Sequence, residues 1–122
     1  MRSLFVGIMS GTRLDGADAA LVDFSSCAPV TLAFASAPFP AQLRERLLAL
    51  STPGQDCLDL AGEVSIDLAL RYAEVAALAM ERASVKAGEV VAIGCHGQTV
   101  RHRPEAGFSI QLGDPARIAE LA

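Results

Sequence analysis

Apolar residues fall into several short runs along the chain, and the first three runs predict strands. These runs cover residues 3–9, 17–24 and 30–39, and segments rich in Gly, Ser, Asp or Pro separate them. Short apolar runs with such boundaries are typical of β-strands. Because the connections between them are short, we expect three consecutive antiparallel strands, which form a meander.

Two later segments repeat their apolar residues with helical spacing. In residues 42–50, Leu43, Leu47 and Leu50 fall on one face of a helix. From about residue 56 to residue 84, apolar residues recur three or four positions apart, and charged residues occupy the opposite side. We therefore expect a short helix and then a long one, with small alanine side chains that allow the long helix to pack closely on a sheet.

The pattern beyond the long helix predicts one more strand, a ribbon and a final helix. Residues 90–95 form a continuous apolar run, which predicts a strand buried on both faces and parallel to an earlier strand. Residues 100–103 and 108–112 alternate in polarity and predict a hairpin. Asp114 followed by Pro115 predicts a helix start, since Asp caps helices well and Pro fits the first helical position.

This order of elements resembles one lobe of an actin- or hexokinase-type kinase, whose core is a ribonuclease-H-like layer. The expected fold class is therefore α/β, with a three-stranded antiparallel meander, one parallel strand and packed helices. The last helical pattern is still unfinished at residue 122. We accordingly expect residues 1–122 to be the amino-terminal lobe of a longer protein whose second lobe is absent.

Composition argues against some classes of binding partner and favours one cellular compartment. The 122 residues are 52% hydrophobic and carry a net charge of −4, so they can bury a core but are poorly suited to hold nucleic acid or an anionic membrane by bulk charge. No apolar run approaches the length of a membrane span, and the first one is too short for a signal peptide. Three widely spaced cysteines favour reduced thiols in the cytoplasm over a disulfide framework.

The glycine-rich segment 7–18, between the first two apolar runs, carries candidate chemistry. Asp15-Gly16 predicts a tight two-residue turn in which Gly supplies a positive φ. The Ser and Thr hydroxyls and successive turn N–H groups also suit an anion. Asp15 and Asp18 would repel a bare phosphate, so a bound phosphate implies a divalent cation or bridging waters. The residues alone leave a plain hairpin and a phosphoryl-transfer site open.

A second polar segment directly follows the apolar run 90–95, and it comprises His96, Gly97, Gln98 and Thr99. Ligands of open α/β sheets gather at the carboxyl ends of strands, so this placement marks a candidate site. Gln98 and Thr99 have neutral donors and acceptors that suit sugar hydroxyls, although they could equally stabilise a turn. Gln111, Gly113 and Asp114 could line the same cleft.

Three segments together resemble the amino-terminal part of the anhydro-N-acetylmuramic acid kinase family. They are residues 7–18, 93–104 and 108–119, in that family's order. The resemblance covers nearly all of this chain but only the opening part of the family's full chain. It implies a cytoplasmic bacterial sugar kinase that uses ATP and Mg²⁺. Such an enzyme opens the 1,6-anhydro bond of its sugar with water and phosphorylates the freed 6-oxygen during cell-wall recycling.

The resemblance also implies roles for single residues. It places the nucleotide-phosphate loop at Gly11, Thr12, Arg13, Leu14, Asp15, Gly16, Ala17 and Asp18. Asp15 or Asp18 would orient Mg²⁺ indirectly, and Arg13 stands where the family usually has Ser. Arg at this position could contact phosphate or crowd the turn. The sugar would contact His96, Gly97, Gln98 and Thr99. No catalytic residue is expected in this chain, because the family's general base lies in the other part of the protein.

Expected partners are a small-molecule sugar and the remaining lobe of the same chain, and a homodimer stays open. Neither nucleic acid nor a membrane is expected. Two other functions also stay open: a non-catalytic nucleotide-binding module of the same superfamily, as in chaperones or filaments, and a self-associating structural domain. ATP-driven shape change without sugar turnover would favour the module.

Overall fold

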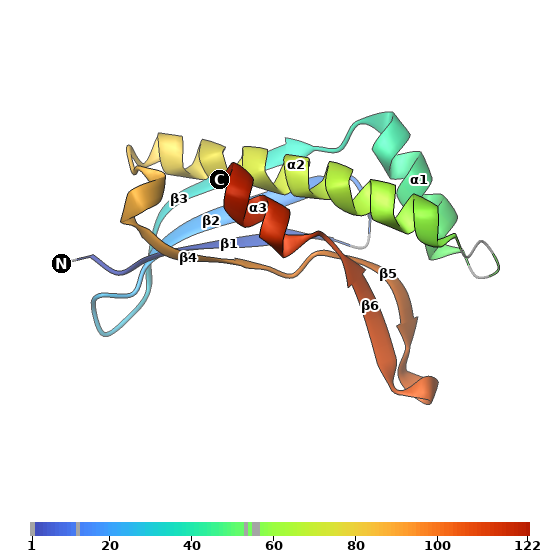
Figure 1. The fold of residues 1–122 in the computed structure, drawn as a ribbon. Helices are drawn as coiled ribbons and strands as arrows, with labels where there is room; N and C mark the ends of the chain where they lie inside the picture. Colours follow the sequence, from blue (N-terminus) through green and yellow to red (C-terminus); the bar gives the residue numbers. More distant parts are fainter. Residues whose placement is uncertain (1, 12, 53, 55–56) are drawn as a thin grey trace.

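The computed structural model describes residues 2–11, 13–52, 54 and 57–122. In this part of the chain, helices lie on one face of a four-stranded sheet, and a two-stranded ribbon projects from the body (Figure 1). The strands of the sheet lie in the order β3-β2-β1-β4, with bounds β1 (Leu4–Ser10), β2 (Gly16–Asp23), β3 (Val30–Pro38) and β4 (Val90–Cys95). β1 to β3 are antiparallel, and β4 is parallel to β1. The predicted α/β class, with its meander and parallel strand, is confirmed and is consistent with an actin/hexokinase-like lobe.

α2 is the helix that packs on the sheet, and the other two helices pack against α2. Their bounds are α1 (Ala41–Ser51), α2 (Leu58–Arg82) and α3 (Pro115–Leu121), and short 3-10 turns span Ala87–Glu89 and Pro104–Ala106. α2 contacts β2 and β3, whereas α1 and α3 pack against α2. The predicted cap of the last helix is confirmed, because Asp114 accepts a hydrogen bond from the Arg117 N–H. Among the described residues, no helix is long and apolar enough to cross a membrane.

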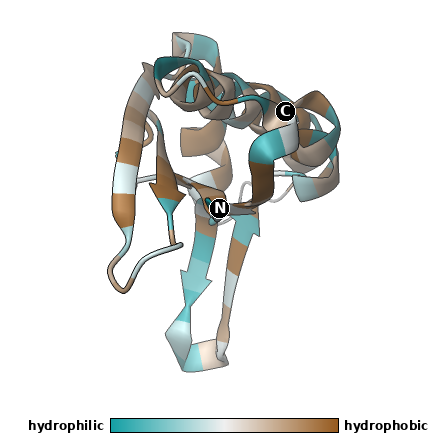
Figure 2. Ribbon diagram, turned by 90° about the vertical axis from the view of Figure 1, so that its left-hand side faces the viewer, coloured by the Kyte–Doolittle hydropathy of each residue, from teal (hydrophilic) through white to brown (hydrophobic). Residues whose placement is uncertain are grey.

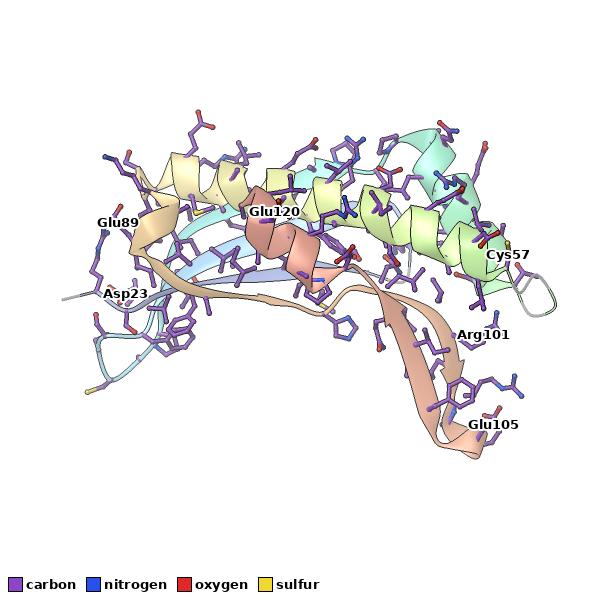
Figure 3. All side chains as sticks on the ribbon, viewed as in Figure 1. Asp23, Cys57, Glu89, Arg101, Glu105 and Glu120 are labelled. Atoms are coloured by element: carbon purple, nitrogen blue, oxygen red, sulfur yellow. The ribbon has the colours of Figure 1, made fainter. Side chains whose placement is uncertain are left out.

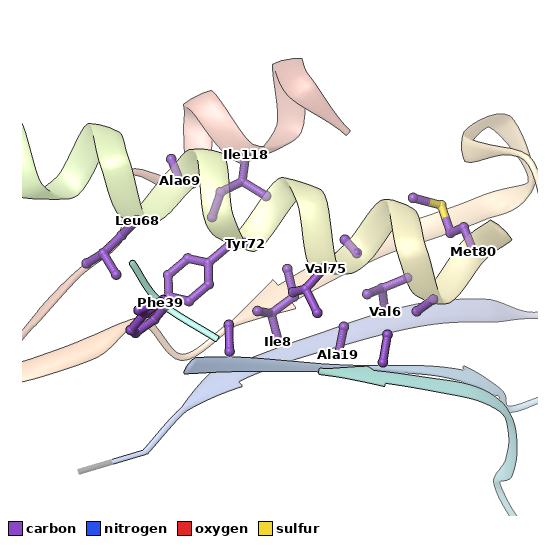
Figure 4. Packing of buried hydrophobic residues seen from close by; sticks show 14 of the residues in the cluster. Val6, Ile8, Ala19, Phe39, Leu68, Ala69, Tyr72, Val75, Met80 and Ile118 are labelled. Carbon is purple, nitrogen blue, oxygen red and sulfur yellow. The ribbon is translucent and has the colours of Figure 1, made fainter. Parts of the chain in front are cut away.

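The core lies between α2 and the sheet, as Figure 4 shows. Alternate residues of β1 and β2 point toward α2, among them Val6, Ile8 and Ala19. Leu68 and Val75 of α2 are fully buried against them. Each such large apolar side chain contributes about 1.5–3 kcal/mol by burial. The small side chains on both surfaces explain why α2 lies close to the strands.

The second face of the sheet is open in the part of the chain that the structure describes. Met9 is 57% exposed and Phe34 is 55% exposed on this face. Phe24 packs edge-on against Phe5, with ring centroids 5.6 Å apart. The prediction that residues 90–95 are buried on both faces is wrong, because β4 is an edge strand and Val91 is 65% exposed. A continuous apolar run does not distinguish a covered strand from an edge strand with an apolar outer surface.

The ribbon consists of β5 (Gln98–Arg103) and β6 (Phe108–Leu112), which pair antiparallel. It extends away from the helices, and hydrophilic and hydrophobic segments alternate along it (Figure 2). At its base, the Arg101 guanidinium donates to the Leu50 carbonyl at the end of α1. The sequence predicted a polar turn of four residues after β4. The turn in the structure is shorter, because Gln98 and Thr99 already belong to β5.

Candidate functional site

Residues 11–15 connect β1 to β2, and their geometry differs from the expected two-residue turn. Gly16 is not a turn residue but the first residue of β2, where it pairs with Pro38. Among the described residues of the connection, Leu14 has a positive φ, 59°. A Cβ atom on Gly16 would lie 2.5 Å from the Ala37 carbonyl oxygen. Glycine is therefore required here by the close approach of β3, and the prediction of a tight Asp15-Gly16 turn is wrong.

Contacts on both sides hold Leu14 and Asp15, two described residues of this connection, in place. The Leu14 N–H donates to the Gly11 carbonyl at 3.3 Å, and the Phe39 N–H donates to the Asp15 carbonyl at 2.9 Å. The Leu14 side chain is 4% exposed within the core. A left-handed backbone costs a residue such as Leu about 1–3 kcal/mol, and burial of the side chain offsets a cost of that size. Leu14 and Asp15 are consequently held in place by the protein itself.

An open pocket of about 570 Å³ lies over this loop. Most of the predicted phosphate-loop residues line it, namely Gly11, Arg13, Asp15, Gly16, Ala17 and Asp18. Leu14 instead points into the core, and Thr12 lies outside the described residues. The loop sequence did not reveal Ser36, which joins the pocket from β3 and donates from Oγ to Asp18 Oδ1 at 2.6 Å. Only the β2–β3 register, which pairs Asp18 with Ser36, brings them together.

The polar groups of this pocket fit a nucleotide phosphate that carries a divalent cation. Arg13, Asp15 and Asp18 are exposed, so one cation and two carboxylates face the same solvent-filled space. Within the described ranges, no group of three His, Cys, Asp or Glu side chains is arranged to hold a metal ion. A cation here would thus take its ligands mainly from phosphate oxygens and water, with one carboxylate orienting it.

The second candidate segment forms a small pocket beside α3. This pocket has a volume of about 170 Å³, and its lining includes His96, Gly97 and Gln111. The His96 N–H donates to the Ile8 carbonyl at 3.1 Å, which extends the pairing of β4 with β1. Thr99 Oγ1 accepts from Gln111 Nε2 at 3.2 Å. Of the three residues suggested for the same cleft, Gln111 and Gly113 line this pocket, and Asp114 is not among its lining residues.

Gly97 allows the turn after β4 to lie against β6. Its φ is 81°, and a Cβ atom would lie 2.6 Å from the Leu112 carbonyl oxygen. Any larger residue would therefore push the ribbon away from the turn. Figure 3 shows the ribbon with its side chains, among which Arg101 and Glu105 are labelled.

Buried polar contacts join the two candidate segments. Gln98 is 1% exposed, and its Nε2 donates to the Gly11 carbonyl at 3.1 Å. Ser10 Oγ lies 2.6 Å from the Tyr72 hydroxyl and donates to the Gly97 carbonyl at 3.4 Å. Figure 4 shows Tyr72 projecting from α2 on the side of the sheet, beside Phe39. The phosphate-loop segment and the turn after β4 are thus neighbours held by direct hydrogen bonds.

Burial changes the acidity of two groups near this network. Burial raises the pKa of Tyr72 above its ordinary value, and the hydrogen bond with Ser10 opposes that rise only in part. Burial also raises the pKa of the Cys95 thiol. Both groups are therefore neutral at physiological pH and act there as hydrogen-bonding or apolar groups, not as charges.

Comparisons with known proteins identify the family of this chain. A family model described as anhydro-N-acetylmuramic acid kinase matches residues 3–122. A relative of that name from Bordetella pertussis is 48% identical over 119 residues, which are 98% of this chain and 32% of the relative. The relative from Cupriavidus metallidurans is 49% identical over 122 residues, and that from Saccharophagus degradans is 44% identical over 124. The chain spans about a third of the length of these relatives.

The family match covers both candidate segments and the ribbon between β4 and α3. The relatives from Bordetella pertussis and Cupriavidus metallidurans share 48% and 49% of their aligned residues with this chain. This chain therefore belongs to the anhydro-N-acetylmuramic acid kinase family.

Proposed function

We propose that the whole protein uses ATP to phosphorylate anhydro-N-acetylmuramic acid, and that residues 11–18 hold the nucleotide phosphates. The observation that carries this proposal is the open pocket of about 570 Å³ that most of these residues line, directly beside a second polar segment. Phosphoryl transfer depends mostly on positioning and charge neutralisation, and the held positions of Leu14 and Asp15 would contribute to the first of these. The names of the relatives supply the substrate.

The loop would bind the phosphates through its main-chain N–H groups and through its exposed charged side chains. Main-chain N–H groups of residues 11–16 would donate to phosphate oxygens. Arg13 would add a charge-assisted contact in place of the hydroxyl of a Ser, and Asp15 or Asp18 would orient a cation through its waters. Magnesium ATP, when bound, supplies the phosphoryl group and the cation that neutralises its charge.

The sugar would lie against the second segment. His96 is exposed at the small pocket, and Thr99 and Gln111 present neutral hydrogen-bonding groups next to it. Such groups suit the hydroxyls of an anhydro-sugar. The base that activates the water for opening of the anhydro ring would come from the remainder of the protein, since the described residues that line these two pockets include no buried carboxylate.

The remaining lobe of the same chain is the partner that we propose for the exposed apolar surfaces. The relatives are about three times as long as this chain. Met9 and Phe34 lie on the open face of the sheet, and a groove of about 470 Å³ runs beside the edge strand β4, where Ile93 and Ile118 line it. Burial of such surfaces by further residues would stabilise the whole protein. We propose a cytoplasmic location for the protein. Light scattering of the full-length protein would decide whether it is a monomer or a homodimer.

A kinase assay on the full-length protein tests the proposed function. Anhydro-N-acetylmuramic acid, other anhydro-sugars and ordinary amino sugars are supplied separately with Mg²⁺ and ATP, and ADP and sugar phosphate are both measured. We expect phosphorylation of the anhydro-sugar. ATP hydrolysis or assembly without any sugar phosphate would contradict the proposal and favour a non-catalytic nucleotide-binding module.

The Asp15→Asn variant tests the phosphate loop itself. Asp15 is exposed, so the substitution leaves the fold intact. We expect turnover to fall by about tenfold or more, because the carboxylate orients the cation. Asp59→Asn, at an exposed aspartate on α2, is the matched control and retains full turnover. Equal turnover in Asp15→Asn and the control would remove the role of Asp15.

A further inference from the structure

The buried Gln98 side chain has a placement that neither strand packing nor sugar binding explains. It begins β5, it is 1% exposed, and it borders neither of the two pockets. Its Nε2 donates to Gly11, which is 87 positions away in the sequence. Its Oε1 has no hydrogen-bond partner among the residues that the structure describes. An apolar residue of similar length would fill the same space without a buried, half-paired amide.

The acceptor of this hydrogen bond is the carbonyl that closes the phosphate loop. The Gly11 carbonyl also accepts from the Leu14 N–H, so it is the point where the loop turns back toward β2. A carbonyl can only accept, which fixes the Gln98 amide with its nitrogen toward Gly11. The turn that directly precedes Gln98 is fixed as well, because Ser10 Oγ donates to the carbonyl of Gly97. The two segments therefore hold each other in a single relative position.

We propose that Gln98 is a positioning residue that sets the phosphate loop in register with the sugar-binding segment. This inference rests on the proposed function and deepens it. Gln98 does not touch the sugar but holds the Gly11 carbonyl, so that the main-chain N–H groups of the loop present the terminal phosphate toward the sugar's 6-oxygen. Without this bond, both substrates still bind, but the loop has freedom to move relative to the turn after β4. Reactive alignment is lost when such a displacement reaches about 1 Å.

The test compares Gln98→Met with wild type in the full-length kinase, with Gln42→Met as the matched control. Met has nearly the same length as Gln but neither donates nor accepts strongly, and Gln42 is exposed on α1. We expect the kcat of Gln98→Met to be about tenfold to a hundredfold lower. The KM for the anhydro-sugar changes by less than about threefold, because the groups that contact the sugar are intact. The melting temperature stays near that of wild type, since the half-paired amide is gone.

A second readout follows the loop directly. Hydrogen exchange of the peptide that contains residues 11–18 becomes faster in Gln98→Met, while exchange in α2 is unchanged. If Gln98→Met does not fold, Gln98→Asn takes its place, because it keeps the amide but is too short to reach Gly11. Either variant is expected to show the same loss of kcat.

Two results would overturn the inference. A kcat equal to that of Gln42→Met would show that the bond to Gly11 does not align the substrates. A rise in the KM for the sugar alone, with kcat and loop exchange unchanged, would show that Gln98 contacts the sugar. Either result leaves the proposed function standing, provided that wild type phosphorylates the anhydro-sugar, whereas an inactive wild type would remove the proposed function itself.

Discussion

The hydrogen bond between Ser10 and Tyr72 offers a quantitative test of how the site is built. The two oxygens are 2.6 Å apart in the interior, and the Tyr72 side chain is fully buried. Ser10 ends β1 directly before the predicted phosphate loop, while Tyr72 lies in the middle of α2. Because Ser10 also donates to Gly97, the Tyr72 hydroxyl is the donor to Ser10. Tyr72→Phe removes one oxygen and leaves the ring that packs in the core.

The structure gives different expected losses for the two partners. Tyr72→Phe removes the hydrogen bond that Ser10 Oγ accepts from the Tyr72 hydroxyl, while Ser10 keeps its bond to Gly97. The free energy of unfolding therefore falls by about 1–1.5 kcal/mol. Ser10→Ala leaves the Tyr72 hydroxyl buried without its partner, which costs about 2–3 kcal/mol. In the double variant both polar groups are gone, and the loss is about 1.5–2 kcal/mol instead of the sum. Tyr72→Phe should therefore cease to be destabilising once Ser10 is Ala.

Urea unfolding of the full-length protein, followed by circular dichroism, measures this cycle. The four proteins are compared at one pH, and their denaturant slopes are checked for equality so that the free energies can be compared. A coupling energy of about 1–3 kcal/mol follows from these losses. Additive losses, with a coupling energy near zero, would refute the argument that these two side chains hold β1 and α2 together.

Further outcomes follow from single groups of the site. Gly16→Ala places a Cβ atom 2.5 Å from the Ala37 carbonyl oxygen and should lower the free energy of unfolding by about 1–3 kcal/mol, with weaker ATP binding; wild-type values by urea unfolding and calorimetry would contradict this. Burial raises the pKa of Tyr72 above 10.0, so the protonated hydroxyl makes its full contribution to the free energy of unfolding below pH 10. That contribution falls by up to about 1.4 kcal/mol per pH unit as the pH rises toward the folded pKa. The urea midpoint of wild type should therefore fall between pH 9 and 11 more than that of Tyr72→Phe, and an equal fall in both proteins would contradict this. Arg13→Ser should weaken ATP affinity by about fivefold to tenfold, with a smaller salt dependence, and tighter binding by calorimetry would mean that Arg13 obstructs the pocket.

Local sequence patterns predicted the elements well where the governing forces are local. Leu43, Leu47 and Leu50 form the buried face of α1, and Asp114 caps α3, both as predicted. Helical spacing and caps depend on residues only a few positions apart. The exposure of β4 could not be predicted in this way, because it depends on which other segments lie against the strand.

The site was harder to predict because contacts between distant residues shape it. Gln98 meets Gly11 across 87 positions, and Ser10 meets Tyr72 across 62. No local pattern signals such pairs. The polarity of the two segments marked them as candidates, but the sequence could not show that Gln98 faces inward. For the same reason, the positive φ was expected at a glycine and occurs at Leu14, whose buried side chain stabilises that conformation.

The central claim is that the loop between β1 and β2 holds the phosphates of ATP. A crystal structure of the full-length protein with Mg²⁺ and a non-hydrolysable ATP analogue tests it most directly. The account predicts phosphate oxygens within hydrogen-bond distance of the main-chain N–H groups of residues 11–16, with the cation near Asp15 or Asp18. A nucleotide bound elsewhere, with no phosphate at residues 11–18, would contradict it.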